Sequence, residues 1–260
     1  MDQLSGENLG DLGVAIHESR KSVKKIRSVL RLFRAELGDT YASQNSKRQA
    51  AGRKLSGLRD AAVMVEVFDK LNHKYPDELS KRTVDKIRGR LAARKNQAYK
   101  EAKNGNLLTE VRTALHACMK SVKRWPLQLD GFPAIAPGIE TTFRRARMAM
   151  KYARKHQEPE NFHEWRKRVK DHWYQTRLLS NLIGHSIRAQ KKNLKKLETW
   201  LGDDHNLAVL RQKMIGQPGL ESLIDRYQTE LRGSALALGE RIYGEQPRQF
   251  TRRMKHLWGG

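Results

Sequence analysis

Basic side chains recur every three or four residues near the N-terminus, beginning with a histidine. This first stripe consists of His17, Arg20, Lys21, Lys24, Arg27, Arg31 and Arg34. On a helix, this spacing places them on one face over several turns. Like charges four residues apart repel one another, and Glu18 is the one acid between residues 17 and 34. The pattern indicates a surface that an anion neutralises, with a solvated basic face as the simpler alternative.

A second stripe begins at another histidine in the C-terminal half. It consists of His163, Arg166, Lys167, Lys170 and Arg177, with Arg168 beside them. Asp171 interrupts this stripe, and three aromatic residues are interleaved with it, namely Trp165, Trp173 and Tyr174. We expect these aromatic side chains to pack in a core, with stacking on nucleic-acid bases as the alternative.

The chemistry that both stripes offer is phosphate binding. An arginine can hold two phosphate oxygens at once, and a lysine acts as a point charge. An imidazole can donate a hydrogen bond to a phosphate oxygen, so we predict this role for His17 and His163, with packing or metal ligation as alternatives. Further cations expected to contribute are Arg53, Arg59, Arg144, Arg147, Lys192, Lys195 and Lys196.

Signatures of catalysis are missing from the sequence. It contains no GxxxxGK[ST] phosphate loop, no GxSxG elbow, no HExxH and no CxxC. Asp203, Asp204 and His205 form the densest group of metal-ligand types, but adjacent residues on a helix point in different directions. We predict a protein without catalytic residues, metal or cofactor. A metal-dependent phosphohydrolase that uses His17, His163 and the two aspartates is the less favoured alternative.

The composition agrees with a polyanion-binding protein. The 260 residues include 52 Lys and Arg against 28 Asp and Glu, for a net charge of +24. A chain this basic repels itself unless an anionic partner neutralises it. Cys118 is the only cysteine, and no apolar run approaches the roughly 20 residues that span a bilayer. The N-terminus lacks the pattern of a signal peptide, so we expect a cytoplasmic protein without membrane insertion.

The apolar residues between these cations recur with helical periodicity, and the sequence shows no sustained alternation typical of a strand. Apolar residues lie at i, i+4, i+7 and i+11 in Ile26, Leu30, Phe33 and Leu37. We predict helices at about residues 9–38, 41–74, 78–103, 107–125, 138–157, 159–183, 186–215 and 218–243. The segment 126–138 holds three Pro and two Gly and is the predicted linker. The basic segment 244–260 is predicted to be a surface tail.

The chain contains an internal repeat. An offset of 146 residues separates His17 from His163 and also Leu55 from Leu201, and the residues after each of these positions align. Two blocks with one offset rarely arise by chance. We therefore predict an all-α fold in which residues 1–260 form a single domain. Two half-repeats, about 9–125 and 138–243, would each form a four-helix bundle, packed into one body.

These motifs resemble the CHAD domain, the conserved histidine α-helical domain. The resemblance covers about residues 9–243 and rests on His17-x-x-Arg20-Lys21-x-x-Lys24-Lys25-x-Arg27, on Leu58-Arg59-Asp60, and on His163-x-x-Arg166-Lys167-x-x-Lys170. It implies two four-helix bundles related by pseudo-twofold symmetry and a basic surface or pore that binds inorganic polyphosphate. Some members carry a fused CYTH triphosphatase domain, and we expect a stand-alone copy here.

The resemblance assigns polyphosphate binding to the basic and histidine positions of both stripes. These are His17, Arg20, Lys21, Lys24, Arg27 and Arg31, and His163, Arg166, Lys167, Lys170 and Arg177. The sequence departs from the family at Asp171 and Trp173, where basic residues are common, and at Asn206, where Asp is common. We predict a non-enzymatic polyphosphate-binding protein, associated with polyphosphate granules and their proteins. A nonspecific nucleic-acid-binding protein is the main alternative.

Overall fold

The computed structural model describes most of the chain. The described residues are 9–54, 56–104, 109, 113, 116–117, 120, 122 and 125–259. Within helices, the side chains outside this description are those of residues 9–17, 20, 47–48, 51–54, 56–60, 62 and 102–104. Over the described residues the chain is helical and holds no strand, which confirms the all-α prediction there. The arrangement as two four-helix bundles stays a prediction.

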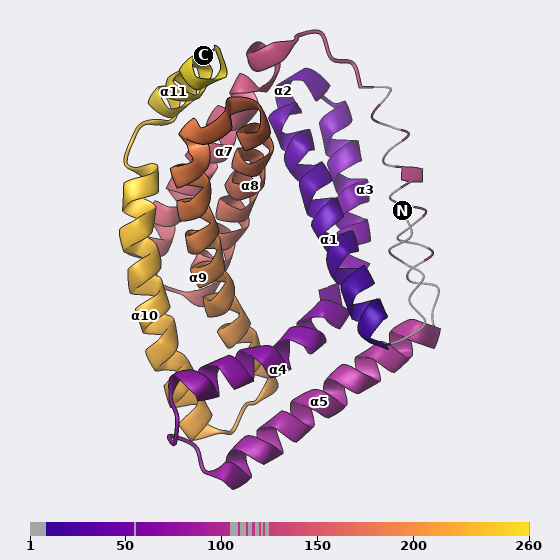
Figure 1. The fold of residues 1–260 in the computed structure, drawn as a ribbon, viewed down its shortest axis with the longest axis vertical. Coiled ribbons are helices and arrows are strands. Elements are labelled where there is room, and N and C mark those ends of the chain that lie inside the picture. Colours follow the sequence, from indigo (N-terminus) through magenta and orange to yellow (C-terminus); the bar gives the residue numbers. More distant parts are fainter. Residues whose placement is uncertain are drawn as a thin grey trace. The chain divides into compact units, whose positions relative to one another are not determined.

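The helices follow the sequence in the order shown in Figure 1. The N-terminal half contains α1 (Leu9–Leu32), α2 (Arg34–Leu37), α3 (Thr40–Lys54), α4 (Ser56–Lys74) and α5 (Lys81–Asn104). The C-terminal half contains α7 (Gly131–Lys155), α8 (Pro159–Ile183), the 3-10 turn η1 (Gly184–Ile187), α9 (Arg188–Lys213), α10 (Pro218–Tyr243) and α11 (Pro247–Gly259). The predicted helices 159–183 and 218–243 match α8 and α10 at both ends.

Helix α7 begins inside the predicted linker, so that prediction is wrong for residues 131–138. Pro133 lies in the first turn, where a backbone N–H has no partner within the helix. Pro137 lies further inside, where proline normally disfavours a helix. Packing outweighs this cost, because Phe132, Ile135 and Ile139 follow at helical spacing and are all buried.

The C-terminal segment forms a packed helix rather than the predicted surface tail. Phe250 and Met254 of α11 are buried. The ring of Phe250 stacks on that of Phe143 of α7, with 4.2 Å between their centroids. The spacing of these apolar residues was the available signal, and the basic residues between them lie on the exposed side of the helix.

The chain divides into two compact units that interleave along the sequence. Unit 1 comprises Met1–Arg27, Ala42–Trp125 and Val209–Arg226. Unit 2 comprises Ser28–Tyr41, Pro126–Ala208 and Tyr227–Gly260. Each unit therefore draws residues from both halves of the internal repeat. In unit 1, α4 packs against α5, and Asp69 accepts a hydrogen bond of 3.0 Å from Arg88 between them.

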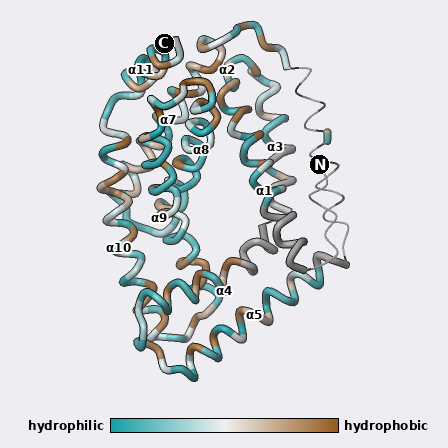
Figure 2. Tube along the Cα trace, in the orientation of Figure 1, coloured by the Kyte–Doolittle hydropathy of each residue, from teal (hydrophilic) through white to brown (hydrophobic). Residues whose placement is uncertain are grey.

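The core of unit 2 lies among α7, α8, α9, α10 and α11. Figure 2 shows apolar positions recurring between polar ones along these helices. Trp165 is fully buried and Tyr174 is 6% exposed, so both pack in the core as predicted. Two glycines allow close packing here. A Cβ atom at Gly138 would lie 2.1 Å from the backbone oxygen of Leu32, and one at Gly239 would lie 2.6 Å from Cζ2 of Trp165.

Candidate polyanion-binding site

The first stripe follows α1, and part of it is engaged inside the protein. Lys21 forms an ion pair with Glu18 at 2.8 Å, and Arg27 donates a hydrogen bond of 3.1 Å to Asn45. Lys24 is half-buried. Arg31 belongs to unit 2, where it is considered below. Four predicted site side chains lie outside the described residues, namely those of His17, Arg20, Arg53 and Arg59.

The second stripe lies on α8, and within unit 2 its side chains lie close to cations of α9. Glu198 of α9 accepts hydrogen bonds of 2.8 Å from Lys170 and from Lys195, one on each carboxylate oxygen. Lys195 and Arg177 also lie over the ring of Trp173, at 5.0 and 5.7 Å from its centroid.

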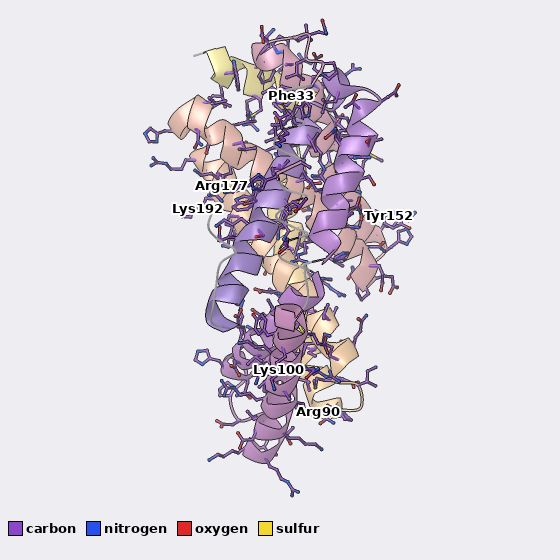
Figure 3. All side chains as sticks on the ribbon, turned by 90° about the vertical axis from the view of Figure 1, so that its right-hand side faces the viewer. Phe33, Arg90, Lys100, Tyr152, Arg177 and Lys192 are labelled. Carbon is purple, nitrogen blue, oxygen red and sulfur yellow. The ribbon has the colours of Figure 1, made fainter. Side chains whose placement is uncertain are left out.

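Two more cations extend this group. Arg166 lies one turn before Lys170 on α8, and Lys192 lies one turn before Lys195 on α9. Arg177 and Lys192, both labelled in Figure 3, are exposed. We call this group the α8–α9 cationic cluster, which consists of Arg166, Lys170, Arg177, Lys192 and Lys195.

The electrostatics of the cluster reflect an excess of positive charge. Burial alone would raise the pKa of Glu198, but Lys170 and Lys195 lower it to about 2, so this carboxylate is ionised. Burial lowers the pKa of Lys170, and Arg166 and Lys195 lower it further, against the opposing effect of Glu198. Arg166 and Lys195 therefore disfavour the charged form of Lys170. A bound anion would relieve that repulsion.

His163, the predicted phosphate donor, faces a second histidine. Its ring lies 4.1 Å from that of His205 of α9, measured between centroids. Burial lowers the pKa of both side chains, and that of His205 falls to about 3 with the further effect of Arg166. Both rings are therefore neutral at pH 7. The Nδ1 atom of His163 is buried without a hydrogen-bond partner among the described residues.

His205 is a residue that the sequence analysis did not assign to binding. A signal was present, because the offset of 146 residues aligns His205 with Arg59, as it aligns His163 with His17. Both members of the histidine pair thus belong to the repeated blocks. Whether His163 donates to phosphate stays a prediction.

Asp204, beside His205, binds side chains of α10. Asp204 accepts a hydrogen bond of 2.7 Å from Arg232 and one of 3.1 Å from Gln228, both on α10. Burial raises the pKa of Asp204, against the opposing effect of Arg232. Within the described part of the chain, no group of three or more His, Cys, Asp or Glu side chains could hold a metal ion.

The remaining predicted cations lie in several environments. Lys167 forms an ion pair with Glu164. Lys192 and Lys196 are exposed, and Lys196 lies over the ring of Trp200 at 4.8 Å from its centroid. Arg144 is exposed beside Glu140, at 3.7 Å.

Arg147 is held by the backbone of unit 2. It donates a hydrogen bond of 3.0 Å to the backbone oxygen of Tyr243, which ties α7 to the end of α10. No described contact joins Arg144 or Arg147 to the α8–α9 cationic cluster.

Over the part of the chain that the structure describes, the fold is helical and the site gathers cations with few accompanying carboxylates. Residues 8–214 match the CHAD domain family, and the chain belongs to this family. The resemblance deduced from the repeated motifs is thereby confirmed. No curated protein matches the chain, and no solved structure does. Among the described helices, none has the length and apolar character required to cross a membrane.

Proposed function

We propose that this protein binds inorganic polyphosphate through the α8–α9 cationic cluster. The observation that carries the proposal is the sharing of one carboxylate, Glu198, by Lys170 and Lys195. Arg166 also lowers the pKa of Lys170, and Arg177 and Lys195 both lie over the ring of Trp173. The cluster thus offers several cations at short spacing to an incoming polyanion.

Polyphosphate fits such a cluster because it is a flexible chain with about one charge per phosphate and no bases. A binder of this chain needs closely spaced arginine and lysine side chains rather than aromatic platforms. Cations already lie over the rings of Trp173 and Trp200, which leaves less ring surface for stacking on a base. This arrangement favours polyphosphate over the nucleic-acid alternative.

The same chemistry extends to the rest of the prediction. The cations of the first stripe on α1 would supply a second set of phosphate contacts. Binding would be driven largely by the release of counterions and would fall steeply with salt, as it does for proteins on DNA. Association with polyphosphate granules in the cytoplasm is the cellular role that we propose for this binding.

The test compares two double variants with equal loss of charge. Arg177→Gln with Lys195→Gln alters the cluster, and Arg248→Gln with Arg252→Gln alters exposed residues of α11. Long-chain polyphosphate is titrated into each protein at several salt concentrations. We expect the cluster variant to bind about tenfold to a hundredfold more weakly, because charge-assisted hydrogen bonds are lost. The α11 variant should bind like the unaltered protein.

Duplex DNA and RNA are titrated in parallel. Polyphosphate should bind more tightly per charge than either nucleic acid, and its binding should persist at physiological salt. Equal weakening of both double variants would show that net charge, rather than the cluster, decides binding. If all three polyanions bound alike and were released together by salt, the basic surface would be nonspecific and the proposal would fail.

A further inference from the structure

The outward side of α7 exposes two large apolar side chains. Met148 is 63% exposed, and Tyr152, one turn later and labelled in Figure 3, is 58% exposed. Phe143 and Ala146 on the opposite side of this helix are buried, so α7 carries apolar residues on two sides. Methionine and tyrosine are enriched where proteins bind one another.

The spacing along this side is that of a helix-helix contact. Exposed residues recur at steps of three, four and three, namely Arg145, Met148, Tyr152 and Lys155. Alternating steps of three and four form the seam along which a second helix packs, and Lys151 lies beside this seam, where charged residues pair with the partner helix. We call Met148, Lys151, Tyr152 and Lys155 the α7 outer face.

The charge of α7 indicates which kind of helix fits there. Helix α7 contains six cations and one acid, Glu140, which lies beside Arg144. Within the described part of the chain, no carboxylate forms an ion pair with Lys151 or Lys155. A second copy of this chain would oppose six cations with six more, whereas carboxylates would neutralise them. Charge complementarity therefore favours an acidic partner over self-association.

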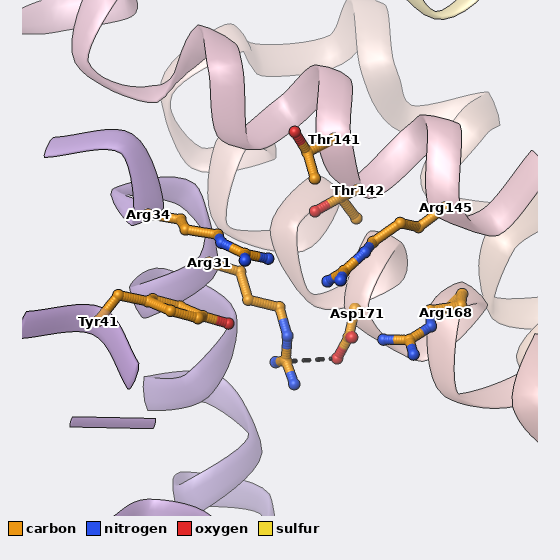
Figure 4. A pocket seen from close by; sticks show the side chains of 8 residues that line it. All are labelled: Arg31, Arg34, Tyr41, Thr141, Thr142, Arg145, Arg168 and Asp171. Carbon is orange, nitrogen blue, oxygen red and sulfur yellow. Dashed lines mark ion pairs between the residues drawn. The ribbon is translucent and has the colours of Figure 1, made fainter. Parts of the chain in front are cut away.

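The seam begins beside a group of arginines. Figure 4 shows Arg145 and Arg34 of α2 pointing toward one another, while Arg31 is paired with Asp171 at 3.0 Å. Partial burial lowers the pKa of Arg145, and the charges of Arg168, Arg34 and Arg31 lower it further. An arginine stays charged at neutral pH even so, so positive charge is concentrated at this end of the seam. A carboxylate of the partner would relieve the repulsion.

Tyr152 is held in place before any partner arrives. Its ring lies 4.6 Å from that of His156, measured between centroids, and its backbone oxygen accepts a hydrogen bond of 2.8 Å from the backbone N–H of His156. A ring fixed in this way loses little freedom on binding. Met148 is flexible and can adapt to the side chains of a partner.

We propose that the α7 outer face is a docking surface for an acidic amphipathic helix of a partner protein. The partner would place apolar residues over Met148 and Tyr152, and glutamate or aspartate against Lys151 and Lys155. A contact along about three helical turns is small for a protein interface, so the binding should be reversible. The proposal does not depend on polyphosphate binding, which we assign to α8 and α9.

A designed peptide tests the proposal on the full chain. The probe is a fluorescently labelled helix of three heptads, with leucine at positions a and d and glutamate at e and g. A second peptide has the same composition in scrambled order, which keeps the charge and removes the apolar stripe. In anisotropy titrations at physiological salt, the first peptide should bind at least about tenfold more tightly. Equal binding, or no binding up to roughly 1 mM, would overturn the proposal.

Met148→Ala with Tyr152→Ala removes the apolar part of the face. Affinity for the first peptide should fall about tenfold or more, the usual effect of truncating central anchors. Leu182→Ala on α8 is the matched control, since Leu182 is 68% exposed, and it should bind like the unaltered protein. Thermal melting checks that each variant is folded. Equal affinities of the double variant and this control would contradict the proposal.

A matched pair of charge variants separates the face from net charge. Lys151→Gln with Lys155→Gln should weaken peptide binding more than Arg248→Gln with Arg252→Gln on α11, where the side chains are also exposed. Equal weakening would show that net charge alone attracts the peptide, and the proposal would fail.

Two further arms distinguish this surface from other anion sites. Long-chain polyphosphate should bind the Met148→Ala, Tyr152→Ala variant and the unaltered protein alike, and loss of that affinity would place the face in the polyphosphate site instead. Vesicles of phosphatidylserine should also bind both proteins alike. Weaker vesicle binding by the variant, with peptide binding unchanged, would identify a lipid surface and overturn the proposal.

Discussion

His172 is a titratable side chain enclosed in the apolar core of unit 2. Its Nδ1 atom lies 3.1 Å from the hydroxyl of Tyr243, and its Nε2 atom lies 3.3 Å from the amide nitrogen of Gln190. Since that amide donates, Nε2 accepts, and the ring proton on Nδ1 is donated to Tyr243. Burial lowers the pKa of His172 to about 3, with a smaller effect from Arg253. The folded protein therefore holds this ring neutral.

This histidine should make the stability of the protein depend on pH. An unfolded histidine has a pKa near 6.5, so between about pH 6.5 and 3 the unfolded chain binds more protons than the folded chain. The free energy of unfolding should fall as the pH drops through this window, by about 1.4 kcal/mol per pH unit for one such group. Urea unfolding of His172→Gln between about pH 4 and 7 should give a shallower slope. Parallel slopes for both proteins would contradict this assignment.

The arginines of α7 show what spacing alone does not reveal. The basic run of α7 predicts site roles for Arg144 and Arg147, whereas it is Arg145 that lines a pocket with Arg31, Arg34 and Arg168. Buried Phe143 and Ala146 fix the rotation of α7 in the core. Which arginine faces a cation of α1 or α2 depends on contacts between distant segments, and these are not encoded in local spacing. Asp171, a departure from the family pattern, serves there as the partner of Arg31.

At the scale of elements, the close approach of α7 to the end of α1 depends on Gly138. A Cβ atom at this position would overlap the backbone oxygen of Leu32, which cannot move aside as a flexible side chain would. We expect Gly138→Ala to lower the free energy of unfolding by about 1–3 kcal/mol or more, the usual cost of overpacking. Chemical denaturation measures this change.

Gly233→Ala on α10 is the matched control for that substitution. A Cβ atom at Gly233 would meet no atom within 4 Å. Alanine favours a helix over glycine by roughly 0.5–1 kcal/mol, so this variant should be slightly more stable. A neutral or stabilising effect of Gly138→Ala would show that the two helices can separate at little cost.

The elements themselves were predictable where apolar spacing was uninterrupted. Helices α8 and α10 have the predicted ends because a proline begins each and the apolar residues recur without a break. Spacing alone does not predict the start of α7, because Pro133 and Pro137 are typical of a break, although packing of the neighbouring apolar residues holds the helix together. The many basic residues of α11 favour a surface tail, whereas the spacing of Phe250 and Met254 is what indicates a packed helix.

At the scale of the whole molecule, the net charge of +24 should oppose folding. Added sodium chloride screens this repulsion, and it also screens the favourable ion pairs. With 52 basic against 28 acidic side chains, repulsion dominates, so moderate salt should raise the melting temperature. About 1 kcal/mol of relief corresponds to a rise of roughly 2–4 °C for a chain of this size. A melting temperature that falls with salt would show that the ion pairs outweigh the repulsion.

The family was predictable because its motifs occur twice with one offset, and a repeated spacing is a property of the sequence alone. The division into two units was not. The predicted half-repeats are continuous segments, whereas each unit takes segments from both of them. Long-range packing decides this division, since short segments such as 28–41 join a core whose other residues lie far along the chain.

This interleaving has a consequence for how the protein is made. Leu30, Leu32 and Leu37 leave the ribosome early, yet they are buried in a unit whose last segment is residues 227–260. A nascent chain halted at residue 214 would contain neither unit in full. Unit 2 therefore completes its fold only after residues 227–260 have left the ribosome, and its first apolar segment must stay unaggregated until then.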